Sequence, residues 1–289
     1  SMETQEFRDI RPSPIAGTWY PGEPTELRRL IENFLQAAKA PEVQGEILGV
    51  IVPHAGLIYS GFTAAHAFKA LIGKEYHRVI LLSPSHQYYR EPLLTTGHEA
   101  YATPLGLVPV DSKALSAIQQ LLSTSTGIEI TPVRRDREHS LEIELPFLQV
   151  VLPKGFSLVP LMLVDQSPEL VRGLADAIAA YLRSLPAEEQ TLLVASSDLS
   201  HFHNENRANQ MDSRILMALE EMNVAELYRL NARGEGEACG LAPIATALLA
   251  CHELGADRVI LADHRTSAAV THDTSSVVGY GSALITKTA

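Results

Sequence analysis

The sequence contains few cysteines, fewer cations than anions, and no long apolar run. The 2 cysteines among 289 residues, Cys239 and Cys251, cannot form a disulfide framework and fit a reducing compartment. Lysine and arginine number 23 against 34 aspartate and glutamate residues, and this net charge of −11 disfavours nucleic acid and anionic membranes as partners. No apolar stretch of about 18 residues occurs, so we expect no transmembrane helix. The first residues lack a cationic segment leading into an apolar one, so we expect no secretory signal and a cytoplasmic protein.

Several well-known catalytic motifs are also missing. The phosphate-binding pattern Gly-x-x-x-x-Gly-Lys-[Ser/Thr] does not occur, and neither does the nucleophile elbow Gly-x-Ser-x-Gly. Cys-x-x-Cys and His-Glu-x-x-His are absent as well. These absences exclude the P-loop nucleotide hydrolases, the serine α/β-hydrolases and the familiar short zinc motifs.

Short β-branched runs alternate with helical periods along the chain. This alternation predicts a single α/β domain over residues 1–289, with a central, largely parallel or mixed sheet flanked by helices. The predicted strands are residues 47–52, 79–82, 158–163, 192–195, 259–261 and 277–285. The predicted helices are residues 25–38, 63–71, 112–122, 168–185, 209–222, 224–231 and 240–254, the first of them capped by Thr25.

Histidine and aspartate follow three of the predicted strands. His54 comes just after the first strand, His86 after the second, and Asp198 and His201 after the fourth. Ligands of open α/β sheets bind beyond the carboxyl ends of the parallel strands. A single histidine in such a place is usually structural, but three segments of this kind predict a shared site.

Cys239 is the natural addition to this cluster. It stands at the start of a predicted helix, where free amide groups and the helix dipole favour a thiolate. Two imidazoles and one thiolate would make a three-ligand metal site with open coordination positions. Cys251 lies further along the same helix among leucines and is expected to be a small buried side chain.

A polar segment, DREHSLEIELPFLQ, contains His139. Such a string is most often a solvated face or an ion-pair network. Its apolar residues would anchor the segment in the core, in which case the polar side could present His139 and Glu142 to the crevice. Both interpretations stay open on the pattern alone.

At these residues the chain resembles the Memo family, also named AmmeMemoRadiSam system protein B. The resemblance rests on seven blocks that occur in order along nearly the whole chain. They are AGTWYPG (16–22), PHAGLIYSG (53–61), SPSH (83–86), EHSLEIELPFLQ (138–149), SSDLSH (196–201), CGLAPI (239–244) and SSVVGYGSA (275–283). The family is similar in fold to class III extradiol dioxygenases, which hold non-haem Fe(II) with two histidines and a glutamate.

The resemblance implies a role for each matching residue. His54 and His86 match the two metal-binding histidines, and Cys239 stands where the dioxygenases have their glutamate. His201 matches the acid/base histidine, Asp198 its neighbour in the pocket, and His139 falls in a block shared with the wider fold. The implied cofactor is non-haem Fe(II), with copper or zinc as alternatives because a thiolate is a softer ligand. If the source is prokaryotic, AMMECR1-like and radical-SAM proteins would be partners.

Three functions remain open at this stage. The first is a metal-dependent redox enzyme or oxygenase acting on an unknown small molecule, with His201 moving a proton and Asp198 orienting His201 or supporting the site. The second is a zinc hydrolase. The third is a non-catalytic module that binds a peptide or ligand in the same pocket, with Arg134, Arg135 and Arg137 as a local cationic patch.

Overall fold

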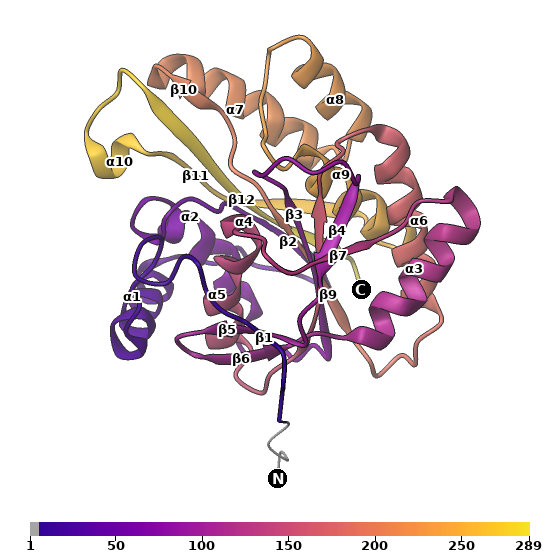
Figure 1. Ribbon diagram of the computed structural model, residues 1–289. Helices are drawn as coiled ribbons and strands as arrows, with labels where there is room; N and C mark the ends of the chain where they lie inside the picture. The colour runs from indigo at the N-terminus through magenta and orange to yellow at the C-terminus, as the bar shows by residue number, and fades with distance from the viewer. Residues whose placement is uncertain (1–5) are drawn as a thin grey trace.

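A computed structural model describes residues 6–289 as an α/β fold built around a long mixed sheet (Figure 1). The strands are β1 (Ile10–Arg11), β2 (Glu46–Val52), β3 (Arg78–Pro84), β4 (Leu93–Thr96), β5 (Ala100–Thr103), β6 (Gly106–Pro109), β7 (Thr131–Val133), β8 (Ser157–Leu163), β9 (Thr191–Ser196), β10 (His201–His203), β11 (Arg258–Thr266) and β12 (Val277–Lys287). Within the described residues the main sheet has nine strands, in the order β10-β12-β2-β9-β3-β8-β4-β7 with β11 paired to β12. A second sheet joins β1, β5 and β6. The first five residues of the predicted domain lie outside the described range.

The middle of the main sheet is parallel. β2 pairs with β9, β9 with β3, and β3 with β8, all in the same direction, so their carboxyl ends share one edge. Every residue of β3 is buried, because helices cover both of its faces. This explains why these strands are continuous valine, isoleucine and leucine runs in the sequence. All six predicted strands are present, and the predicted α/β class with a mixed sheet is confirmed.

Helices pack on both faces of the sheet, as Figure 1 shows. They are α1 (Pro24–Ala37), α2 (Leu57–Phe68), α3 (Ser112–Thr126), α4 (His139–Glu142), α5 (Glu144–Val151), α6 (Pro168–Arg183), α7 (Glu205–Glu220), α8 (Val224–Ala232), α9 (Leu241–Glu253) and α10 (Ala268–Thr271), with a 3₁₀ turn at Lys69–Leu71. Alternate residues of β3 point to opposite faces of the sheet and pack against different helices. Val79 and Leu81 pack with α1, α2 and α5, whereas Ile80 and Leu82 pack with α3, α6 and α9. Among the described residues, no helix combines the length and apolar character that crossing a membrane requires.

Three predicted helix starts are wrong. One is that of α7, which begins at Glu205, four residues before the predicted start at residue 209. Glu23, not Thr25, caps α1, because its carboxylate accepts hydrogen bonds from the amides of Thr25 (3.0 Å) and Glu26 (2.9 Å). α2 begins at Leu57 rather than at residue 63, so the chain turns into a helix three residues after His54. The short strands β1, β4–β7 and β10 were not predicted, because two to four residues are too few to show a period.

Candidate metal centre

Three parallel strands deliver polar residues to one edge of the sheet. His54, Asp198 and His86 each stand two residues beyond the end of β2, β9 and β3, respectively. β9 lies between β2 and β3. The expected meeting of these segments at the carboxyl edge is therefore observed.

His54, His86 and Cys239 form a compact group. One ligand atom from each lies within 4.8 Å of the other two. His54 Nε2 lies 3.2 Å from Cys239 Sγ. His54 is buried, while the His86 side chain is 38% exposed, so the group is open on the His86 side. Two imidazole nitrogens and a thiol sulfur are donors that suit Zn, Cu and Fe, and these residues could hold a metal ion.

The ring of His54 is oriented by hydrogen bonds on the side away from Cys239. Ser196 Oγ lies 3.0 Å from His54 Nδ1 and 2.6 Å from the carbonyl oxygen of Ser140. A carbonyl only accepts, so the single hydroxyl hydrogen of Ser196 goes to Ser140, and Nδ1–H of His54 donates to Ser196. This leaves the lone pair on Nε2, which faces Cys239.

Asp198 contacts the same histidine, and Glu144 contacts its partner Ser196. Asp198 Oδ1 accepts a hydrogen bond from the backbone amide of His54 at 2.8 Å, and its Oδ2 lies 3.8 Å from His54 Nε2. Within residues 6–289, Asp198 thus contacts His54, whereas the hydrogen bonds of His201 go to Leu199 and Glu237. Glu144 Oε1 lies 3.4 Å from Ser196 Oγ. Burial, and next the charge of Asp198, raise the pKa of Glu144 well above its usual range.

Cys239 lies two residues before α9 begins. Its Sγ accepts a hydrogen bond from the amide of Asp198 at 3.3 Å. Burial, followed by the Asp198 carboxylate, raises the pKa of the Cys239 thiol to about 12. In the protein without a metal, burial therefore opposes the thiolate that the helix start was expected to favour. A bound cation would reverse this balance.

A close backbone approach fixes the position of Cys239. A Cβ atom at Gly240 would lie 2.3 Å from the carbonyl oxygen of Ser196, so only glycine fits there. Gln166 binds the same loop through both ends of its side-chain amide. Its Nε2 donates to the backbone carbonyl of Cys239 (3.1 Å), and its Oε1 accepts from the backbone amide of Ala242 (2.7 Å). The loop before α9 is thereby held against β9.

The second histidine of the group is held by Glu138. Glu138 is buried, and its carboxylate accepts hydrogen bonds from His86 Nδ1 at 2.7 Å and from the backbone amide of His86. The hydroxyl of Ser140 also donates to it, at 2.6 Å. Burial alone would raise the pKa of Glu138, but the hydrogen bonds from His86 and Ser140 outweigh it and lower the pKa to about 2. Nε2 of His86 is left free to bind.

His139 belongs to the cluster through its ring. It lies 5.4 Å from the His54 ring centre and 4.6 Å from that of His86, and the indole of Trp19 stacks on it at 3.9 Å. Burial, and next the neighbouring His54, lower the pKa of His139 to about 4, so it is neutral at pH 7. Of the two interpretations left open by the sequence, the structure favours the one that brings His139 beside His54 and His86.

Glu142 does not accompany His139 to the crevice. Its carboxylate is fully buried and accepts hydrogen bonds from Arg11 (2.6 Å), Ser13 (2.6 Å) and Tyr20 (2.6 Å). Arg11 also binds Asp136 at 2.8 Å. This network ties the segment that carries Trp19 to the segment that carries His139.

His201 lies at the start of β10. Its Nδ1 donates to the carbonyl of Leu199 at 2.8 Å, which leaves Nε2 with the lone pair. The backbone amide of His201 donates to Glu237 Oε1 at 3.2 Å. Glu237 stands two residues before Cys239, so this bond joins β10 to the cysteine loop.

The expected cationic patch is partly neutralised. Arg134 binds both carboxylate oxygens of Asp9, at 2.7 and 3.0 Å. Arg135 and Arg137 form no ion pair with any of residues 6–289. Only two of the three arginines are therefore available to an anion.

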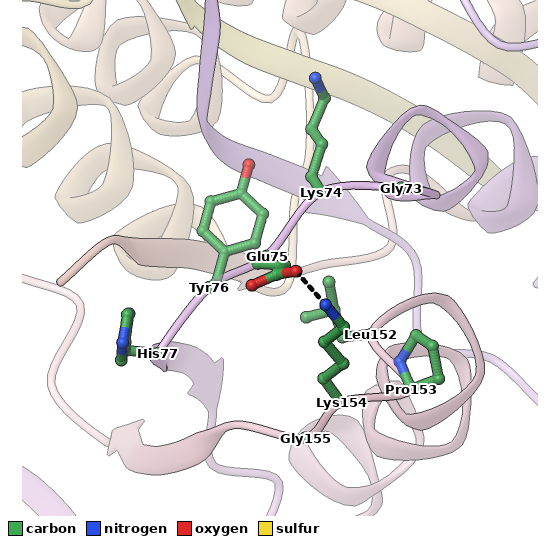
Figure 2. Close-up of a pocket in the computed structure, with 9 residues that line it drawn as sticks. All are labelled: Gly73, Lys74, Glu75, Tyr76, His77, Leu152, Pro153, Lys154 and Gly155. Atoms are coloured by element: carbon green, nitrogen blue, oxygen red, sulfur yellow. Dashed lines mark hydrogen bonds and ion pairs between the residues drawn. The ribbon is translucent and has the colours of Figure 1, made fainter. Parts of the chain in front are cut away.

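A separate pocket of about 470 Å³ lies at the other end of β3. Residues 73–77 and 152–155 line it, and Figure 2 shows Lys154 and Glu75 facing each other in an ion pair across it. His77 comes just before β3, whereas His86 comes just after it. The pocket and the histidine–cysteine group are therefore on opposite edges of the sheet.

These features define an α/β protein with a His/His/Cys group at the carboxyl edge of its parallel strands, able to hold a metal ion. The chain belongs to the Memo family. The model of this family, described as "Memo-like protein", matches residues 11–284. A "MEMO1 family protein" of Nitrosopumilus maritimus is 37% identical over 276 residues, covering 94% of this chain and 98% of the relative. Another of Thermotoga maritima is 34% identical over 285 residues, covering 95% and 99%. The predicted family is confirmed.

Sequence reasoning missed three supporting residues. Trp19 was noted only as part of the block AGTWYPG, Glu138 was expected to lie in a polar string, and Gln166 drew no attention. The aromatic residue in the turn AGTWYPG was the one available signal for Trp19. Glu138 and Gln166 had none, since their roles depend on partners 52 and 73 residues away.

Proposed function

We propose that this protein is a metal-dependent redox protein that binds iron through His54, His86 and Cys239. The main support is that the three ligand atoms lie within 4.8 Å of one another. In addition, the Nδ1 atom of each histidine is hydrogen-bonded to a neighbouring side chain, which leaves Nε2 free to bind a metal. The donor chemistry fits a borderline metal, because two neutral imidazoles and a deprotonated thiol would surround it. When bound, such a metal supplies electron transfer and Lewis acidity to a ligand in its open positions.

The other residues of the cluster have roles that follow from their contacts. His201 would accept or donate a proton at Nε2, because Leu199 occupies its Nδ1. Asp198 would hold the backbone of His54 and offset the charge of the centre. His139, kept neutral and stacked on Trp19, would line the ligand space without adding charge.

The second candidate is a zinc hydrolase built on the same residues. The tetrahedral preference of zinc and its affinity for imidazole and thiolate favour it. In that case Asp198 or His201 would serve as the base for a water molecule. A binding module without catalysis is the third candidate, supported by Arg135 and Arg137 near the Glu138 segment.

Metal analysis distinguishes the first two candidates. The protein would be purified anaerobically without a metal-affinity tag, beside His54→Ala and Cys239→Ser, and its iron, copper and zinc measured by elemental analysis. Cys251→Ser is the matched control, because Cys251 is fully buried away from the cluster in α9. Near-stoichiometric iron that is lost in His54→Ala and Cys239→Ser but kept in Cys251→Ser supports the proposal. If the wild-type protein contains zinc instead of iron, the zinc hydrolase is favoured. Unchanged metal content in His54→Ala and Cys239→Ser would contradict the proposed metal site.

A further inference from the structure

Phe202 has a backbone conformation that is unusual for a bulky residue. Its φ is 66°, in the left-handed region that L-residues with large side chains avoid. It lies where the pairing of β10 with β12 is irregular, between His201 and His203. Glycine is the usual occupant of a left-handed position in a β-bulge. The chain therefore tolerates strain at Phe202.

Glu237 holds the bulge in place from both sides. Its Oε1 accepts from the backbone amide of His201 at 3.2 Å and from His203 Nε2 at 2.7 Å. Strained residues persist only where surrounding contacts over-determine them, and they concentrate at functional sites. Here the clamp belongs to the loop that leads into Cys239.

The side chain of Phe202 gains nothing from burial that would offset the strain. It is 75% exposed. Its ring meets the ring of His201 edge-on, with centroids 5.6 Å apart and planes at 78°. His201 follows Asp198 by three residues, and its amide is bonded to Glu237, two residues before Cys239, so the bulge is joined to two segments of the candidate metal centre.

We propose that the bulge presents Phe202 as a ligand-contacting residue that selects for an apolar face on the molecule bound at the metal centre. The inference rests on the proposed function for the location of that ligand. It adds a specificity-determining residue outside the group of metal-binding and proton-transferring residues. The observations that carry it are the left-handed φ, the clamp by Glu237 and the exposed ring beside His201.

The test compares Phe202→Gly with wild type and with His272→Gly. His272 is also exposed and left-handed (φ 61°), but it lies in the turn between β11 and β12, and no aromatic contact within residues 6–289 includes it. The probes are benzohydroxamate and acetohydroxamate, which share one metal-binding group and differ by a phenyl ring against a methyl group. Binding to the zinc-loaded proteins would be measured by calorimetry.

Phe202→Gly should weaken benzohydroxamate binding about five- to tenfold, the loss expected for one aromatic contact. Acetohydroxamate binding should stay within about twofold, since its methyl group offers little area to the ring. His272→Gly should change neither. An equal effect of Phe202→Gly on both probes, or none on either, overturns the proposal.

Unfolding of the metal-free proteins gives an independent readout. Relief of the strain should raise the unfolding temperature of Phe202→Gly by about 1–4 °C after the extra flexibility of glycine is counted. A lower unfolding temperature, or a change in the molar mass measured by light scattering, would mean that Phe202 serves packing or a subunit contact, and would overturn the inference. If the wild-type protein binds neither zinc nor iron, the proposed function is contradicted instead. Elemental analysis detects this outcome independently of the Phe202 variants.

Discussion

The carboxylate of Glu138 binds His86 twice, through the ring nitrogen Nδ1 at 2.7 Å and through the backbone amide. A carboxylate that accepts from the far nitrogen of a histidine fixes the ring and makes the near nitrogen a better metal ligand. His86 is the most exposed of the three candidate ligands, so it depends most on such support.

Replacement of Glu138 by glutamine should weaken metal binding without removing a ligand. Glutamine keeps the shape of the side chain but not the charge, so we expect metal affinity to fall about 10–100-fold. Competition with a chromogenic chelator measures this directly. Glu75→Gln, at the other end of β3, is the control and should bind as wild type. Wild-type affinity in Glu138→Gln would show that His86 needs no charged support.

A methyl group added at Gly240 should disturb both stability and metal binding. The new Cβ would meet the carbonyl oxygen of Ser196 at 2.3 Å, and the loop that carries Cys239 would have to shift. We expect Gly240→Ala to lower the free energy of unfolding by about 1–3 kcal/mol, as overpacking does, and to lower metal content.

Gly56→Ala is the matched control for that clash. Gly56 also stands near the cluster, but a Cβ there would lie 3.5 Å or more from any neighbour. Urea unfolding of the two variants and wild type compares them on one scale. Equal stability of the two alanine variants would contradict the steric argument.

The ion pair of Asp111 and Arg78 should make part of the stability depend on pH. Burial alone would raise the pKa of Asp111, but the amide of Ala114 and the guanidinium of Arg78, 2.8 Å away, outweigh it and lower the pKa. A lowered pKa in the folded state contributes stability above the unfolded value, about 3.9, and this contribution disappears as the pH falls through the folded value. Wild type should therefore exceed Asp111→Asn by about 1–2 kcal/mol at pH 7, and the difference should shrink below pH about 4.

Urea unfolding at a series of pH values, repeated in an Arg78→Met background, tests this pair. In Asp111→Asn the asparagine can still cap α3, so the difference in stability between aspartate and asparagine reports the charge. In the Arg78→Met background the difference between aspartate and asparagine should be smaller at every pH. A difference that grows as the pH falls would have the wrong sign and would refute the assignment.

The buried network around Arg11 should be costly to break. Arg11 is 2% exposed and binds the carboxylates of Asp136 and Glu142. Arg11→Met would leave both carboxylates buried without a cation, and we expect a loss of about 3–5 kcal/mol. Arg134→Met is the control, because the Arg134–Asp9 pair is solvent-exposed and should cost less than about 1 kcal/mol. Similar losses in the two variants would show that burial of the Arg11 network does not matter.

The position of the site could be predicted because it depends on a rule about parallel strands. His54, His86 and Asp198 are each close in sequence to a recognisable strand, and the strands meet at their carboxyl ends. The residue types then suggested a metal, and the place of Cys239 at a predicted helix start added it as a third ligand, in agreement with the resemblance. None of these steps needed the packing of side chains.

The details that failed depend on tertiary packing. Burial and the Asp198 carboxylate raise the pKa of the Cys239 thiol, whereas the sequence shows only that a helix follows. The stack of Trp19 on His139 joins residues far apart in the chain. Asp136, Glu138 and Glu142 look like a solvated string, yet all three are buried because Arg11, Ser140 and His86 provide their partners.

β12 is the last strand along the chain, but it pairs with β2, β10 and β11. The edge of β2 opposite β9 therefore stays open until residues 277–287 have been made. During synthesis, His54, His86 and Cys239 would all leave the ribosome before the strand that seals β2. Folding must then wait for a contact between distant parts of the chain, which is a slow kind of closure. The candidate metal centre would become rigid only at the end of that process.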